Sequence, residues 1–551
     1  MKPQDDNITI YRARRILTMN PSNPEAKCVA VKGDRFLGAG SLDELSGWGE
    51  FELDERFAGK VLMPGLVEGH SHIMEGVFWR YVYCGYFDRM DPAGAIWPGV
   101  KTLDDVLARL AARDSELEDE NAPLAGWALD PIYFGDSRLS RADLDSISTV
   151  RPIGVLHASG HIMNVNTKAL ELAGLLRPGI NHSGVPLGDD GLPTGELKGP
   201  DAMMMANEYV DFDREVLSCD EQGLKEFARL CVRTGVTTAA DLANPLPDEA
   251  VQIMLRVTGE DTFPVRIVSL RRFFGMTPAE MVERAIELKQ KSSDRLRLGI
   301  VKVVADGSVQ GFTARLRWPG HFNGAPNGLW YVSPEQLQGL YEAALAHDVQ
   351  VHTHNNGDEA TELALDMMER ALRKHPHPDH RFTLQHTQLA DAAQYRRMKS
   401  LGLCVNVFSN HVYYWGDKHP VKTVGAERAC RMNACRTALR EGVPLAIHSD
   451  APVTPLAPFF TAWCAVNRLT ASGKVLGEEE RIGVQEALFA ITIGAAFTMK
   501  LDSEIGSIEV GKKADMAVLE DDPLEIGAEN LKDVKVWGVM QGGRIFPAES
   551  I

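Results

Sequence analysis

The chain has 551 residues, of which 44% are hydrophobic, and a formal net charge of −18 at pH 7. It is much longer than the roughly 250 residues of a plain α/β barrel, so we expect more than one structural unit. The excess of acidic residues argues against binding nucleic acid or an anionic membrane surface.

The chain begins with residues 1–7, which lack the apolar core of a signal peptide. No run of 18 apolar residues follows that could span a bilayer. The eight cysteines include no Cys-x-x-Cys pair, which fits reduced thiols better than disulfides or a zinc knuckle. We therefore expect a soluble cytoplasmic protein.

Both ends of the chain carry short β-strands. Residues 8–62 alternate apolar strands with turns, and residues 514–546 have the same character. Neither end is long enough to bury a good core alone. The sequence thus predicts a small β-sandwich built from residues 1–62 and 501–551.

A His-x-His pair, His70 and His72, follows the apolar run of residues 61–67. Side chains two residues apart on a strand point to the same side, so both imidazoles can meet one ion. Such a pair is common by chance in a chain with 16 histidines. Its meaning depends on what the later strands contribute.

A long segment separates this first barrel strand from the next one, at residues 235–238. The gap exceeds 150 residues, far more than an ordinary connection between a strand and a helix needs. We expect an inserted subdomain at about residues 78–230, beside the mouth of the active site.

Short β-rich segments alternate with helix-like stretches through residues 63–500, a pattern typical of parallel strands with crossover helices. Eight such units close into a (β/α)8 TIM barrel, whose reactive residues lie at the carboxyl ends of the strands. The predicted strands end near His70, Thr238, Leu270, Val304, His354, His386, Val407 and His448.

Candidate metal ligands recur at these strand ends. Lys302, His354, His386 and Asp450 join the histidine pair, although residues 70 and 450 are nearly 400 positions apart. A structural histidine has no reason to recur at the same end of successive strands, so we expect one shared site. His70 and His72 suit one zinc-like ion, and His354 and His386 suit a second.

Other residues near the expected mouth of the barrel could each have one of two roles. The aromatic residues in the segments after strands four and seven could form substrate walls or loop cores. His352 is expected to alternate with His354, so that one of the two faces outward. His448 could support a ligand or simply pack. The aromatic residues are Trp318, Phe322, Tyr413, Tyr414 and Trp415.

In combination, these motifs resemble the amidohydrolase superfamily, in the family 3 branch that includes N-substituted formamide deformylase-like hydrolases. The resemblance covers nearly the whole chain. It is carried by His70-Ser71-His72 after Met63-Pro64-Gly65-Leu66, Val301-Lys302 before Ala305-Asp306-Gly307-Ser308, His354 before Gly357-Asp358, Leu384-Gln385-His386, and His448-Ser449-Asp450-Ala451-Pro452, together with residues 155–170 and 506–515.

The resemblance implies a catalytic barrel with a terminal β-sandwich and a modified lysine. Lys302, on strand four, would be carboxylated by CO2 and would bridge two zinc ions. An ion pair between Lys302 and a neighbouring acid such as Asp306 is the alternative, and a one-metal site would then remain. The family pattern also puts His354 inward. Gln385 and Asn355-Asn356 depart from the pattern and change the polarity around the ligands.

These residues predict a hydrolase that uses a metal-activated water to cleave a carbon–nitrogen bond, other than a peptide bond, in a small-molecule amide. Asp450 is expected to bind metal, to accept a proton from the water and to protonate the leaving nitrogen. His161 and His411 could stabilise the oxyanion, hold the substrate or serve a structural role.

Two alternatives remain open. The same site could hydrolyse carboxylic esters, lactones or cyclic amides, since the attacked group is a carbonyl in each. A catalytically silent metal-binding barrel is the alternative from another class, although such a barrel would not need Asp450 as a proton shuttle. The sequence is also compatible with a homo-oligomer.

Overall fold

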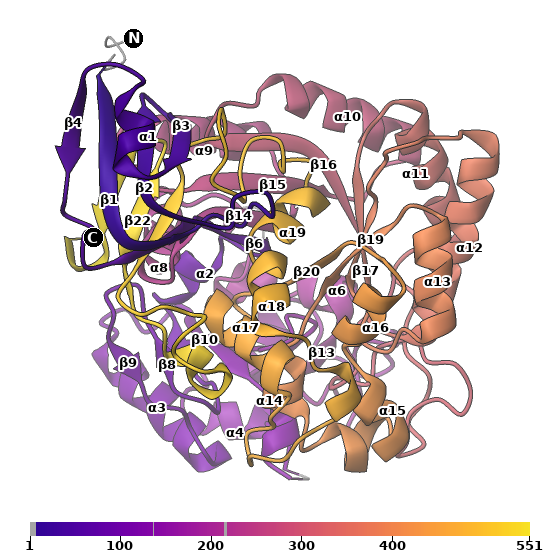
Figure 1. Ribbon diagram of the computed structural model, residues 1–551. Coiled ribbons are helices and arrows are strands. Elements are labelled where there is room, and N and C mark those ends of the chain that lie inside the picture. The colour runs from indigo at the N-terminus through magenta and orange to yellow at the C-terminus, as the bar shows by residue number, and fades with distance from the viewer. Residues whose placement is uncertain (1–6, 136, 214–216, 551) are drawn as a thin grey trace.

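The computed structural model describes residues 7–135, 137–213 and 217–550. Its largest part is a barrel of eight parallel strands (Figure 1). A bridge between Ser71 and Ala451 joins the end of the first barrel strand to the segment after the last. The predicted (β/α)8 TIM barrel is confirmed. In their order around the barrel, its strands are β6 (Leu66–Ser71), β14 (Val236–Asn244), β15 (Arg266–Arg272), β16 (Leu296–Val304), β17 (Val351–Asn355), β18 (Thr383–His386), β19 (Cys404–Val407) and β20 (Leu445–Ile447).

Helices connect the barrel strands and surround them (Figure 1). Their apolar faces and the outer faces of the strands share one large hydrophobic core. The helices are α8 (Glu221–Arg233), α9 (Asp248–Gly259), α10 (Pro278–Gln290), α11 (Pro334–Ala346), α12 (Asp358–Lys374), α13 (Ala392–Ser400), α16 (Cys435–Arg440), α17 (Pro458–Asn467) and α18 (Val484–Ala490).

The starts of these helices are encoded locally. At α10 the Thr277 side chain accepts a hydrogen bond from the Glu280 backbone, and the Glu280 side chain accepts one from the Thr277 backbone. Ser333 and Gln336 form the same reciprocal pair at α11. Each helix also has proline at its first position, where a missing N–H costs nothing.

The amino-terminal end of the barrel is filled by α19 (Ile493–Thr498), which packs against β6, β19 and β20. The carbonyl of Thr498 accepts hydrogen bonds from Gln350 Nε2 and Thr383 Oγ1, near the starts of β17 and β18. The carboxyl-terminal end of the barrel is left for the site.

The two ends of the chain form one β domain, as predicted. Its eight strands are hydrogen-bonded in one mixed sheet, and a buried ion pair of 2.6 Å between Arg266 and Asp515 ties this domain to the barrel. The strands are β1 (Ile8–Leu17), β2 (Glu25–Lys32), β3 (Arg35–Gly40), β4 (Phe51–Asp54), β5 (Val61–Pro64), β21 (Met516–Leu519), β22 (Val536–Gln541) and β23 (Arg544–Pro547), with α1 (Leu42–Ser46) beside them.

The expected subdomain follows β6 and has a five-stranded sheet with hydrophobic clusters of its own. The subdomain contains α2 (Glu75–Phe78), β7 (Val82–Tyr83), α3 (Leu103–Glu116), β10 (Leu124–Leu129), α4 (Arg141–Asp145), β11 (Ile153–His157), β12 (Ile162–Val165), α5 (Thr167–Leu172), β13 (Glu196–Lys198) and α6 (Gly199–Met204), with β8 (Arg89–Met90) and β9 (Ile96–Trp97) as a separate hairpin.

None of the described helices is both long and apolar enough to cross a membrane.

Candidate metal centre

The carboxyl ends of five barrel strands meet at one cavity of about 380 Å³. All six residues that the sequence suggests as metal ligands line it, although they are spread over 381 positions of the chain. The shared cavity is what a common site requires. The six residues are His70, His72, Lys302, His354, His386 and Asp450.

His70 and His72 turn the same kind of nitrogen toward Asp450. His70 Nε2 lies 3.2 Å and His72 Nε2 3.4 Å from Asp450 Oδ1. The other ring nitrogens donate hydrogen bonds, His70 Nδ1 to Gln385 Oε1 and His72 Nδ1 to the Leu242 carbonyl, each at 2.7 Å. Because the proton is held on Nδ1, the Nε2 lone pairs are free to bind metal.

The surroundings of Asp450 favour the ionised form of its carboxyl group. Burial alone would raise the pKa of its carboxyl group, but His72, His448 and Lys302 outweigh burial and hold the pKa below the ordinary value. An anionic oxygen beside two imidazole nitrogens is a common ligand set for a divalent transition metal.

His386 reaches the cavity through an unusual backbone conformation. On β18 the preceding residue, Gln385, already faces the barrel interior, so simple alternation would turn His386 outward. His386 has φ +69°, and this left-handed turn brings its ring to 4.4 Å from that of His354 and 4.6 Å from that of His70.

Lys302 is buried in the cavity wall, and its Nζ has no hydrogen-bond partner among the described residues. The alternative pairing with Asp306 is not formed. Asp306 instead accepts hydrogen bonds of 2.9 Å from the backbone N–H groups of Asn356, Gly357 and Arg315. Burial lowers the pKa of Lys302 to about 7, and Asp450 opposes the shift.

These groups fit a metal centre for a physical reason. Lys302 Nζ and both ring nitrogens of His386 are buried and have no hydrogen-bond partner in the described part of the chain. Each such atom costs about 1–3 kcal/mol if it remains unpaired. Several unpaired donor atoms around one cavity are explained if they bind ions.

His352 corrects one expectation from the sequence. Residues two apart on a strand share a face, so His352 and His354 both point inward and neither faces outward. His352 Nδ1 accepts a hydrogen bond from Gln385 Nε2 at 2.8 Å, and its Nε2 donates to the Thr498 carbonyl at 3.0 Å. Gln385 therefore links His352 to His70 and orients both rings.

The two histidines suggested as substrate contacts have different positions. His161 lines the cavity, with its ring 5.8 Å from that of Tyr331 and 5.7 Å from that of His354. His411 is not among the residues that line the cavity, which favours the structural role that the sequence left open for it. It packs 4.5 Å from Trp415, and Gln388 Nε2 donates to its Nδ1 at 3.1 Å.

The aromatic residues that the sequence left open as substrate walls or loop cores do not line this cavity. Trp318 and Phe322 are 94% and 61% exposed and border a different pocket. Residues 413–415 do not line the cavity either. The apolar wall comes instead from the inserted subdomain and from segments after β15 and β16: Phe78, Trp127, Met203, Phe212, Phe273, Phe274, Trp330 and Tyr331.

Sequence reasoning missed these wall residues although two signals were present. The subdomain was expected beside the mouth, which predicts that it contributes walls. Phe273 and Phe274 directly follow β15, where a TIM barrel places residues that meet the substrate. Arg272, the last residue of β15, lines the cavity beside Lys302, its register partner on β16.

Comparison with known proteins agrees with this geometry. The amidohydrolase family model matches residues 58–547. The chain is 26% identical to Protein LONG AFTER FAR-RED 3 of Arabidopsis thaliana, over 97% of this chain and 90% of that one. It is 25% identical to N-substituted formamide deformylase of Arthrobacter pascens, over 95% of each chain.

A solved structure shares the fold. An uncharacterized metal-dependent hydrolase from Pyrococcus horikoshii superposes with a TM-score of 0.72 at 21% identity, covering 95% of this chain and 99% of that chain. The match to the family model extends from the end of the N-terminal strands through the barrel to the last strand. The chain therefore belongs to the amidohydrolase family.

Proposed function

We propose that this chain is a metal-dependent hydrolase that cleaves a carbon–nitrogen bond, other than a peptide bond, in a small-molecule amide. One observation carries the proposal: four imidazoles, an unpaired lysine and a carboxylate from five strands border one cavity. Similarity to N-substituted formamide deformylase supports the choice of an amide.

The residues present fit two divalent ions, and we infer zinc from the imidazole-rich donor set. His70, His72 and Asp450 would hold one ion, and His354 and His386 the other, with a carboxylated Lys302 shared between them. Bound ions of this kind supply Lewis acidity, which makes water a nucleophile near neutral pH.

Side chains of the protein then transfer the protons and bind the substrate. Asp450 takes a proton from the attacking water and returns it to the departing nitrogen, since an ionised carboxylate at the cavity can do both. His161 lies at the cavity wall, where it holds the carbonyl group of the substrate.

Removal of metal is expected to abolish turnover. The protein would be dialysed against a chelator, its metal content measured, and hydrolysis followed with a panel of N-substituted amides before and after adding Zn²⁺. Esters and lactones form a parallel panel. Turnover of esters alone would contradict the amide proposal, and metal binding without turnover in either panel would favour a silent barrel.

The apolar wall indicates that the substrate carries an apolar or aromatic group. Phe274→Ala should raise KM for a phenyl-substituted amide roughly fivefold, because Phe274 is 45% exposed and contributes only part of a buried ring's free energy. KM for an unsubstituted formamide should stay unchanged. Phe322→Ala, outside the cavity, is the matched control. Equal KM changes in both variants would exclude this wall.

A further inference from the structure

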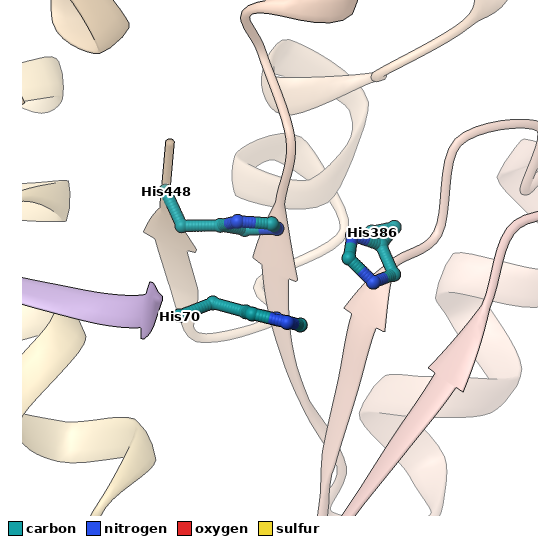
Figure 2. A group of neighbouring side chains, drawn as sticks. All are labelled: His70, His386 and His448. Atoms are coloured by element: carbon teal, nitrogen blue, oxygen red, sulfur yellow. The ribbon is translucent and has the colours of Figure 1, made fainter. Parts of the chain in front are cut away.

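A fifth imidazole, His448, lies beside the candidate metal ligands His70 and His386. It follows β20 directly and precedes by two residues Asp450, which lines the cavity. Figure 2 shows its ring above that of His70, with His386 facing both. The ring centroids of His448 and His70 are 4.5 Å apart at an interplanar angle of 15°, and those of His448 and His386 are 5.0 Å apart.

The nitrogens of His448 are unusual for a packed histidine. The side chain is fully buried, and neither Nδ1 nor Nε2 has a hydrogen-bond partner among the described residues. By contrast, His70, His72 and His352 each use a ring nitrogen in a hydrogen bond. Two unpaired buried nitrogens are costly unless something binds them.

We propose that His448 is a further metal ligand, which would join His386 on the second of the two ions, next to His70 on the first. One nitrogen from each ring lies within 4.8 Å of the others. Two nitrogens on a tetrahedral zinc ion lie roughly 3.4 Å apart. A pair of nitrogens at the 4.8 Å limit would therefore close by about 1.4 Å on binding. Imidazole donors favour Zn²⁺, Co²⁺ or Ni²⁺ over Mg²⁺ or Ca²⁺.

The competing role for His448 is packing alone. Its other face stacks on Phe408, with centroids 5.0 Å apart and an interplanar angle of 21°. A phenylalanine at position 448 would keep this stack between Phe408 and His70 but would remove both nitrogens. His448→Phe therefore separates the two roles, because only a ligand role makes the nitrogens matter.

The inference rests on the proposed metal centre, and the test uses the whole chain. Co²⁺ affinity would be measured by chelator competition, and the visible absorption of bound Co²⁺ recorded, for wild type and His448→Phe. His411→Phe is the matched control, because His411 is also buried and touches Phe408 but does not belong to the group of neighbouring ligand atoms that His70, His386 and His448 form. We expect His448→Phe to weaken Co²⁺ binding at least tenfold and to change the spectrum, and His411→Phe to do neither.

The other outcomes are distinguishable. If His448→Phe keeps wild-type affinity and spectrum, the ligand role is overturned while the proposed function stands. If wild type binds no Co²⁺ or Zn²⁺, the proposed function fails and this inference with it. His448→Asn, which is smaller and also lacks the imidazole, serves if the phenylalanine variant does not fold. Circular dichroism of the metal-free proteins checks folding in each case.

Discussion

Asp450→Asn is expected to lower kcat for an amide substrate by about 10³-fold, within the range for loss of one acid–base group. The asparagine oxygen can still lie near His70 Nε2 and His72 Nε2, where Asp450 Oδ1 now lies at 3.2 and 3.4 Å. It cannot carry a proton from water to the leaving nitrogen. Turnover should therefore fall much more than metal content.

Rate and metal content must be measured on the same preparation. Asp43→Asn changes an exposed carboxylate beside the terminal sheet and serves as the matched control, with unchanged kcat and metal content. If Asp450→Asn retains both metal and wild-type kcat, Asp450 is not the proton shuttle. If it loses metal and turnover together, the carboxylate acts chiefly as a ligand.

The barrel could be predicted because its signal is local and repeated. Each strand is a short β-rich segment followed by a helix, and the reciprocal caps at Thr277 and Ser333 fix where two of the helices begin. The carboxyl ends of parallel strands meet at one end of a barrel, so the convergence of His70 and Asp450 follows from topology.

The details that strand periodicity does not supply depend on backbone turns and long-range packing. Strict alternation would turn His386 away, and only its left-handed φ of +69° returns it to the cavity. His411 follows β19 closely, yet its ring packs on Phe408 and Trp415 instead of facing the cavity. No local pattern in the sequence encodes either outcome.

The apolar wall was missed for a similar reason. Phe78, Met203 and Phe212 come from distant parts of the inserted subdomain and meet in its own hydrophobic cluster. Only the packing of that subdomain against the barrel mouth puts them in the cavity. The sequence therefore located the candidate metal ligands better than the apolar wall of the cavity.

Lys302→Ala is expected to cost at least about 100-fold in metal affinity and to reduce turnover correspondingly, because the anionic ligand that we propose the two ions share would be lost. Burial lowers the pKa of Lys302 to about 7, although Asp450 opposes the shift, so a sizeable fraction of the amine is uncharged near neutral pH. An uncharged amine can attack CO2. The nitrogen forms a bond to carbon, one proton is released, and the product is a carbamate with two oxygens.

Carbon-13 NMR of the metal-loaded protein in labelled bicarbonate should show a carbamate signal in wild type that Lys302→Ala lacks. Lys474→Ala, at a side chain that is 79% exposed and outside the cavity, should keep the signal and full metal content. Acetate or formate should partly restore metal binding to Lys302→Ala, because a small carboxylate can enter the space that the side chain leaves. Full metal affinity in Lys302→Ala without added carboxylate would contradict a bridging role, since His70, His72, His354, His386 and Asp450 would then suffice.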